Sequence, residues 1–368
     1  MTLAEEARRS VLDAGLAAGL SAAGTCTARA WDGTRAVVEA RRRGGLADTM
    51  AFTYRNPVRS TDPSRLLRDA ATLFVGATGY APASVPAPEA PASARVGWYA
   101  TDDFYAQLRA GLVAMAGVLR RLGFRAVVVA DDNGLVDREA AWRAGLGWYG
   151  RNSLLLSPKL GSWTVLGSVV TDASVAHVAQ PMADRCGACT ACRPACPTGA
   201  IGADRSVDAR RCLAWIVQRP GPIPLDLRSA VGDRVYGCDE CQEACPPNQA
   251  VVVRLSRSGG LAVGAAPGRW IDAAAWLLLG DDDLAEAWGR WYLPARDVGI
   301  ARRNLLVVLG NSGAASSTAV VRAVRAHVDH PDPVVAEQAR WSAERLGMAV
   351  ADADAWHEHR RSGEDGAP

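Results

Sequence analysis

Eight of the nine cysteines in this 368-residue chain fall between positions 186 and 245, and their spacing could hold metal clusters. The first four follow the pattern C-x2-C-x2-C-x3-C-P, and a second group repeats the C-x2-C-x3-C-P ending. Thiolates at these intervals ligate [4Fe–4S] clusters, because three cysteines on a tight loop reach three irons of one cluster. The spacing therefore predicts two such clusters in one short segment.

The cysteine before each proline points away from its own loop and is expected to ligate the cluster of the other motif. We assign one cluster to Cys186, Cys189, Cys192 and Cys245. We assign the other cluster to Cys196, Cys212, Cys238 and Cys241. Cys212 is the least regular member of its set, because it stands far upstream of the motif that it completes.

Zinc and disulfide bonds are the two alternatives to iron–sulfur ligation. Structural zinc sites pair C-x2-4-C with a second pair, not with a third cysteine two residues further on. Disulfides suit small secreted chains, whereas this chain is long and begins without a signal-peptide core. The spacing therefore favours iron–sulfur clusters over both alternatives.

The charge of the chain is balanced, with 41 basic and 39 acidic residues and a formal net charge of +2. A global electrostatic attraction to nucleic acid is thus excluded, and any such binding must use a local patch. Hydrophobic residues make up 49% of the chain, enough for the cores of two or three domains. No apolar run reaches the ~18 residues of a membrane span. We expect a cytoplasmic protein with reduced thiols.

The first half of the chain alternates between strand and helix patterns, which predicts an α/β domain up to about residue 180. The predicted strands are 71–80, 125–130 and 163–171, and the predicted helices are 3–20, 102–122 and 137–144. The strand at 125–130 is apolar throughout, as is typical of a parallel sheet. Residues 81–94, rich in Pro, Ala and Ser, are expected to form an irregular loop.

Asp131 directly follows the strand predicted at 125–130. Carboxylates at the carboxyl end of a parallel strand commonly face a ligand crevice, so Asp131 is a candidate functional residue. The alternative is that the run Asp131-Asp132-Asn133-Gly134 is only a polar turn that caps the following helix. The residues alone leave both interpretations open.

Short helices follow the cysteine segment. They are predicted at 273–279, 302–311, 317–327 and 332–346, the last with proline in its first turn. Their Asp-Pro punctuation resembles a HEAT-type helix pair, and ordinary helical packing is the alternative. The ninth cysteine, Cys26, is expected to be buried and structural.

The predicted fold class is therefore a mixed α/β and α+β multidomain protein. We predict four parts: an α/β domain at 1–178, a ferredoxin-like two-cluster domain at 179–255, a helical HEAT-like region at 256–350 and a flexible tail at 351–368.

The order of these pieces resembles the epoxyqueuosine reductase family, and the resemblance covers nearly the whole chain. The double cysteine motif is one part of it. The other matching segments are Asp131 with Asp137-Arg138-Glu139-Ala140, the run from Arg143 to Asn152, Gly161-Ser162-Trp163, Asp208 to Cys212, and Arg303-Asn304 with Leu309-Gly310-Asn311.

The resemblance implies a cobalamin-dependent reductase that removes the epoxide oxygen of epoxyqueuosine at the tRNA wobble position and yields queuosine. The amino-terminal domain would hold cobalamin, and the corrinoid reductive dehalogenases look like relatives with the same redox core. The first histidine of the chain is His177, so residues 1–176 offer no imidazole ligand for cobalt. This is consistent with a cobalamin bound without a histidine.

The resemblance also assigns roles to single residues. Asp131 matches the proposed general acid and lies among the expected cobalamin contacts. The other expected cobalamin contacts, from the matching loops, are Arg59, Asn152, Ser153, Gly161 and Ser162. Candidate contacts to tRNA phosphate are Arg219, Arg302 and Arg303, for which a solvated helix face is the alternative.

Two departures concern the substrate. Many members of the family have Asp-Tyr-His where this chain has Asp103-Phe104-Tyr105, and a Tyr-Leu-Thr run where it has Trp215-Ile216-Val217. The second interpretation is therefore a corrinoid reductase acting on another substrate, such as an organohalide. The third is a plain electron-transfer protein, which would not need the large α/β domain. We expect a monomer that takes electrons from a flavodoxin- or ferredoxin-type donor.

Overall fold

The computed structural model describes residues 2–80, 82, 88, 90, 92–258 and 268–349. The chain forms two compact units. Unit 1 contains Met1–Val85, Gly97–Ile216 and Gly237–Arg269, and unit 2 contains Pro86–Val96, Val217–Tyr236 and Trp270–Pro368. The α/β segment and all eight clustered cysteines therefore share unit 1, while the carboxy-terminal helices belong to unit 2. The predicted tail at 351–368 lies outside the described residues.

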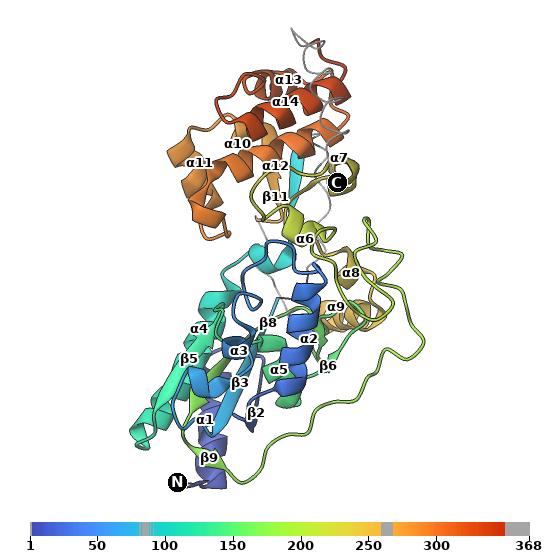
Figure 1. Cartoon of the computed structure of the whole chain (residues 1–368). Helices are drawn as coiled ribbons and strands as arrows, with labels where there is room; N and C mark the ends of the chain where they lie inside the picture. Colours follow the sequence, from blue (N-terminus) through green and yellow to red (C-terminus); the bar gives the residue numbers. More distant parts are fainter. Residues whose placement is uncertain are drawn as a thin grey trace. The chain divides into compact units, whose positions relative to one another are not determined.

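A four-stranded sheet forms the centre of unit 1 (Figure 1). Its order is β2 (Ala22–Thr27), β3 (Thr72–Gly79), β8 (Thr164–Thr171) and β5 (Ala126–Ala130). Every neighbouring pair is antiparallel, with Phe74 opposite Val169 and Val169 opposite Val128. The strands at 71–80 and 163–171 are confirmed. The parallel sheet inferred from residues 125–130 is wrong, because a strand buried on both faces has the same apolar pattern in either direction.

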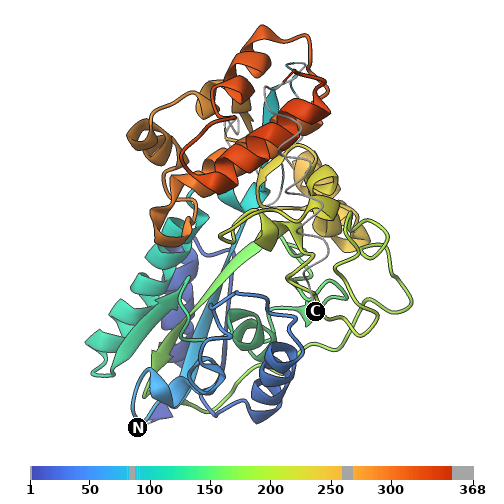
Figure 2. The same ribbon diagram turned by 45° about the horizontal axis from the view of Figure 1, so that its top comes forward.

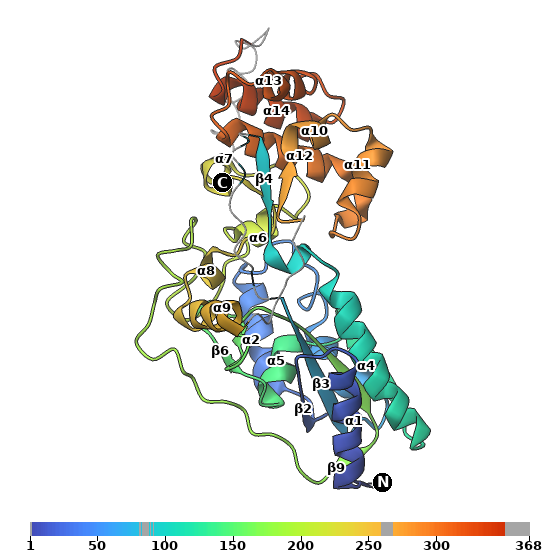
Figure 3. The same cartoon turned by 180° about the vertical axis from the view of Figure 1, so that it is seen from behind.

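Helices cover both faces of this sheet, and the period-two alternation of the strands decides which residues face which helix. Phe74 and Val169 pack with α4 (Phe104–Arg121). Helix α1 (Glu5–Ala17) lies beside α4 (Figures 2 and 3). Leu73 and Val170 pack on the other face with α5 (Asp137–Arg143). All three helices were predicted from periodicity and are confirmed.

The remaining elements of unit 1 are two helices of 12 and 13 residues, α2 and α9, and several shorter segments. They are β1 (Thr2–Leu3), α2 (Asp32–Arg43), α3 (Pro57–Ser60), η1 (Pro63–Arg65), η2 (Trp98–Ala100), β6 (Trp148–Tyr149), β7 (Leu155–Leu156), β9 (Ser174–Val175), α6 (Leu213–Ile216), α8 (Glu240–Glu243) and α9 (Pro246–Ser258). Cys26 is 3% exposed, and burial raises the pKa of its thiol to about 12, as expected of a structural cysteine.

Unit 2 combines a three-stranded sheet with helices. The sheet has the order β10 (Arg234–Tyr236), β4 (Ser93–Val96) and β11 (Trp270–Asp272), with β10 parallel and β11 antiparallel to β4. The end of the loop predicted at 81–94 is therefore a strand. The other elements are α7 (Leu225–Val231), α10 (Ala273–Leu277), α11 (Asp281–Trp288), η3 (Pro294–Arg296), α12 (Val298–Asn311), α13 (Thr318–Arg325) and α14 (Pro333–Arg345).

Helix α12 is the core of unit 2, since residues 300–310 are all buried and α14 packs along it. An aromatic cluster of Tyr236, Trp276, Trp288 and Trp291 fills the space beside it, with Tyr236 stacked 5.4 Å from Trp291. The four predicted carboxy-terminal helices are thus confirmed, and their classification as HEAT-like stays a prediction. No helix within residues 2–258 and 268–349 has the length and apolar character needed to span a bilayer.

Candidate functional site

The eight cysteines fall into two groups by their electrostatic neighbours. Burial, and then the neighbouring thiols of Cys186, Cys192 and Cys189, raise the pKa of the Cys245 thiol to about 11. Burial likewise raises the pKa of the Cys241 thiol, with Cys238, Cys212 and Cys196 as its nearest charged neighbours and Cys192 beyond them. These groups match the two ligand sets expected from spacing. Cys245 neighbours the first motif although it stands in the second.

This arrangement fits two [4Fe–4S] clusters, because each group offers four soft thiol donors and the pattern of neighbours crosses between the motifs. Among the residues that the structure describes, no three Cys, His, Asp or Glu side chains lie close enough to hold one metal ion. The fit therefore rests on two four-thiol groups and not on a mononuclear site.

Cys212 reaches its group through local hydrogen bonds, despite its irregular spacing. The Thr198 hydroxyl donates to the Arg211 carbonyl at 2.5 Å, and the Arg211 Nε donates to the Thr198 carbonyl at 2.7 Å. This reciprocal pair joins the segment after Cys196 to the residue before Cys212. Burial raises the pKa of the Cys212 thiol, and the neighbouring Cys196 raises it further.

A buried polar network fastens the second cysteine turn to the α/β domain. The Asn248 amide donates to the Ser162 hydroxyl and to the Gln242 carbonyl, both at 2.8 Å, and its oxygen accepts from the Ser162 N–H at 2.8 Å. The Gln242 amide donates to the Ser162 carbonyl at 3.0 Å and to the Tyr80 hydroxyl at 3.2 Å. Both amide side chains are almost fully buried, so the network holds the turn in one position.

Three residues expected to contact cobalamin take part in this fastening. Asn152 is 5% exposed, and its amide donates to the Cys241 carbonyl at 3.3 Å. Ser162 is bonded to Gln242 and Asn248 as described. Gly161 has φ +61°, and a Cβ there would collide with the Asn248 side chain. Their family-like pattern is explained by the junction between the sheet domain and the cysteine turn.

The other two expected contacts lie on loops. Arg59 is exposed, with one guanidinium nitrogen 4.0 Å from the Asp132 carboxylate. Ser153 has φ +60°, and its hydroxyl donates to the Arg205 carbonyl in the cysteine segment. Only Arg59 and Asp131, of the residues expected to bind cobalamin, present exposed side chains.

Asp131 has φ +54°, a backbone conformation that is costly for a side chain and is often found at functional sites. It follows β5 in an antiparallel sheet, so the crevice argument based on parallel strands does not apply to it. The surrounding protein desolvates its carboxyl and raises the pKa, Arg109 opposes this shift and Asp132 adds to it. A raised pKa suits an acid that must hold a proton near neutral pH.

Two residues beside Asp131 were not predicted to be functional. Burial raises the pKa of the Asp137 carboxyl well above its usual value, and the charge of Asp131 raises it further. The Asp137 Oδ1 atom is buried and has no hydrogen-bond partner among the described residues. Burial also raises the pKa of the Tyr105 hydroxyl, with Asp131 and Asp137 as charged neighbours. The signal that could have identified Asp137 is its place at the start of the family-like segment Asp137-Arg138-Glu139-Ala140.

The structure corrects the expectation for Arg302 and Arg303. Arg302 is 5% exposed and donates to the carbonyls of Leu277 and Leu279, both at 2.9 Å. Arg303 is fully buried and donates to the carbonyls of Arg219, at 2.8 Å, and Gly221. Both guanidinium groups are therefore committed inside unit 2 and do not present a surface to phosphate. Arg219, the third candidate, is half-buried.

Comparison with known proteins agrees with this geometry. A family model described as "4Fe-4S double cluster binding domain" matches residues 185–248, the segment that carries both cysteine groups. The chain is similar to epoxyqueuosine reductase of Staphylococcus aureus, with 30% identity over 257 residues, 67% of this chain and 66% of that protein. It is also similar to epoxyqueuosine reductase of Pseudomonas aeruginosa, with 36% identity over 268 residues, 70% of this chain and 71% of that protein.

The fold is similar to that of a solved epoxyqueuosine reductase crystallised "with a tRNA-TYR epoxyqueuosine-modified tRNA stem loop". The TM-score is 0.81, and the match covers 99% of this chain and 95% of that one. At 23% identity, this likeness concerns the fold alone.

Proposed function

Because this chain belongs to the epoxyqueuosine reductase family, we propose that it reduces epoxyqueuosine to queuosine at the wobble position of tRNA. The observation that carries this proposal is the joint placement of both cysteine groups and the Asp131 loop in unit 1. Arg138 links them, since its charge acts both on the Cys212 thiol and on the Asp137 carboxyl. The clusters that supply electrons and the carboxyl groups that supply protons would thus lie in the same unit.

Two [4Fe–4S] clusters and cobalamin are the cofactors of this proposal. The two four-cysteine sets would hold the clusters, and Arg59 and Asp131 would contact the corrin. Cobalamin would supply low-potential reducing power at cobalt. The buried, unpartnered Oδ1 of Asp137 supports a bound polar group beside Asp131.

Removing the epoxide oxygen as water consumes two electrons and two protons and leaves a carbon–carbon double bond. Asp131 would give the first proton to the leaving oxygen, because its raised pKa keeps the carboxyl protonated more readily than an aspartate with the ordinary pKa. Asp137 and Tyr105 neighbour Asp131 and would supply the second proton. The electrons would come from an external carrier of the flavodoxin or ferredoxin type. Cys189, which is exposed, marks the first cluster as the entry point.

We also propose a tRNA contact on unit 2, in place of Arg302 and Arg303. A hollow of about 290 Å³ is lined by Trp288, Trp291, Tyr292 and Arg296. Tyr292 is 56% exposed, and Arg296 has φ +55°. An exposed aromatic ring beside an arginine suits stacking of an unpaired base next to a phosphate. Arg219 remains a further candidate for tRNA phosphate.

We further expect three properties, which concern the helical region, the cellular location and the oligomeric state. The helices α10 to α14 would form the HEAT-like region, the protein would act in the cytoplasm, and it would work as a monomer. Scattering in solution with and without a tRNA anticodon stem loop would test the last of these.

The decisive experiment uses full-length protein purified without oxygen and supplied with iron, sulfide and cobalamin. It is incubated with tRNA carrying epoxyqueuosine and a chemical reductant, and the released nucleosides are measured by mass spectrometry. We expect queuosine from the unchanged chain and none from Asp131→Asn, with cluster and cobalamin spectra unaltered. Full activity of that variant would contradict the acid role.

Two other results would favour the alternatives. Cobalamin uptake with no queuosine, together with halide release from an organohalide, would favour a corrinoid reductase for another substrate. Bound clusters without any cobalamin uptake would favour a plain electron carrier.

A further inference from the structure

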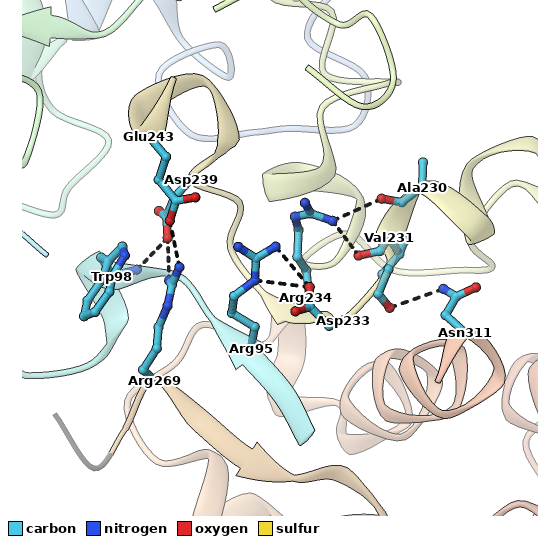
Figure 4. Close-up of polar contacts among 11 residues, drawn as sticks. Arg95, Trp98, Ala230, Val231, Asp233, Arg234, Asp239, Glu243, Arg269 and Asn311 are labelled. Carbon is cyan, nitrogen blue, oxygen red and sulfur yellow. Dashed lines mark hydrogen bonds and ion pairs between the residues drawn. The ribbon is translucent and has the colours of Figure 1, made fainter. Parts of the chain in front are cut away.

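One guanidinium group, that of Arg269, is bonded to two carboxylates of the second cysteine turn, which supplies ligands to both clusters. Its Nη1 lies 2.6 Å from Asp239 Oδ2, and its Nη2 lies 2.9 Å from Glu243 Oε1 (Figure 4). Asp239 stands between Cys238 and Cys241, which belong to the second cluster. Glu243 stands two residues before Cys245, which belongs to the first. A single cation thus neighbours ligands of both clusters.

Arg269 is held rigidly in this position. It is 4% exposed, and its guanidinium lies 4.3 Å from the centre of the Trp98 ring. The backbone N–H of Trp98 also donates to Asp239 Oδ2 at 3.0 Å, so this oxygen accepts from both Trp98 and Arg269 (Figure 4). A buried charge pair with good hydrogen bonds and a stacked aromatic ring loses little by relaxation. The cation is therefore held at a fixed distance from the second cysteine turn.

The backbone of Asp239 connects this ion pair to the ligands. Its carbonyl accepts from the N–H groups of Gln242 and Glu243, both at 2.8 Å, and so starts the short helix α8. Cys241 lies within that helix. A change in the position of the Asp239 side chain would therefore move the backbone that carries Cys238 and Cys241.

We propose that Arg269 is a positioning residue that fixes the cysteine turn and sets the reduction potential of the cluster held by Cys196, Cys212, Cys238 and Cys241. Reduction of a [4Fe–4S] cluster adds one electron and hence one negative charge. A buried cation nearby favours the reduced form, and a buried carboxylate opposes it, because charges interact strongly where water is excluded. This inference rests on cluster binding by the cysteines and not on the identity of the substrate.

The charge argument predicts opposite effects for the two partners. Arg269→Gln leaves two carboxylates without their cation, so the potential of that cluster should fall. Asp239→Asn leaves the cation in excess, so the potential should rise. Each change should alter the ratio of reduced to oxidised cluster at a fixed potential by about tenfold, which is 59 mV for a one-electron couple. The double variant should return close to the unchanged protein.

The experiment is an anaerobic redox titration of the full chain followed by electron paramagnetic resonance. Arg95→Gln is the matched control, because Arg95 forms a similar pair with Asp233, 3.0 Å apart, within unit 2 (Figure 4). This variant should leave the reduction potentials of both clusters unchanged. Arg269→Lys keeps the charge and should retain most of the original potential, even if Arg269→Gln loses iron.

Several results would overturn the proposal. Shifts of both single variants in the same direction would mean that the pair acts only as a structural support. An equal shift in Arg95→Gln would mean that the effect is not local. A double variant displaced as far as either single variant would exclude compensation between the two charges. Each result is independent of queuosine formation, so failure here is distinguishable from failure of the proposed function.

Discussion

The two cysteine turns of this protein share the C-x2-C-x3-C-P ending but have very different surroundings. In the first turn, Cys189 is exposed, and the segment 180–200 forms neither helix nor strand. In the second turn, a short helix and three buried polar side chains, Gln242, Asn248 and Asp239, tie the backbone to unit 1. Cysteine ligands can therefore be presented both by an exposed loop and by a turn that buried hydrogen bonds hold in place.

The difference indicates a division of labour. A cluster that receives electrons from a soluble carrier must approach the surface, so an exposed loop suits it. A cluster that passes electrons inward must keep a fixed distance to its acceptor, which a buried network provides. If this comparison is correct, equivalent substitutions in the two turns will have unequal effects.

Loss of one ligand from each turn should give the largest contrast. Cys241→Ala removes a buried thiol that neighbours three others of its set, so we expect loss of about half of the iron and a protein that unfolds readily, because cluster binding contributes to folding. Cys189→Ala removes an exposed thiol, and the second cluster should survive. Iron analysis and thermal unfolding of the anaerobic proteins measure both effects. Equal destabilisation by the two variants would remove the basis of the comparison.

The second contrast concerns the buried network. Asn248→Ala leaves the Ser162 N–H and the Gln242 carbonyl buried without their partner, which should cost about 3 kcal/mol of unfolding free energy. Release of iron from the second cluster to a chelator should also become faster. Urea unfolding and chelator kinetics measure the two effects. Val253→Ala, at an exposed position of helix α9, is the control and should change neither.

A pH-dependent effect should follow from Asp137, whose buried carboxyl has that of Asp131 as a charged neighbour. Its pKa in the folded protein is raised by burial and then by Asp131, so the folded state holds this proton more tightly than the unfolded state. That contribution to stability is fully present below the unfolded pKa and is lost as pH rises through the folded pKa. Asp137→Asn cannot lose a proton, so its stability relative to the unchanged protein should rise with pH.

Urea unfolding at pH 5.5 and pH 8.5 compares the two proteins. Asp282→Asn, on the exposed start of α11, should show no such trend. A stability difference independent of pH would mean that Asp137 is ionised in the folded protein.

How far the sequence predicted these features depends on whether the signal was local. The double-cluster segment followed from spacing, because cluster geometry is encoded in intervals of two and three residues, and the assignment of each cysteine to one cluster stays a prediction. The helices α4 and α14 followed from periodicity in the same way. The direction of β5 did not, since the apolar run 126–130 contains nothing that separates a parallel from an antiparallel neighbour.

Polar contacts between residues far apart in the chain could not be predicted from the sequence either. Arg302 and Arg303 look like surface cations, and only the fold brings carbonyls from residues 219, 221, 277 and 279 to them. Asn152 and Ser162 hydrogen-bond residues of the second cysteine turn and of helix α9, and their expected contact with cobalamin stays a prediction. No sequence pattern predicted the role of Arg269, because its partners Glu243 and Asp239 lie 26 and 30 residues away in the chain.

The smallest expected effect tests whether the first turn is as weakly held as its exposure suggests. The Arg151 guanidinium donates to the Gly187 carbonyl at 2.6 Å, between Cys186 and Cys189. Because this bond is exposed to water, Arg151→Ala should cost less than about 1 kcal/mol of unfolding free energy. It should nevertheless speed the release of iron from the first cluster, while the second cluster and the control Arg257→Ala stay unchanged. A loss as large as that of Asn248→Ala would show that the first turn is anchored as firmly as the second, and exposure of Cys189 would then say nothing about electron entry.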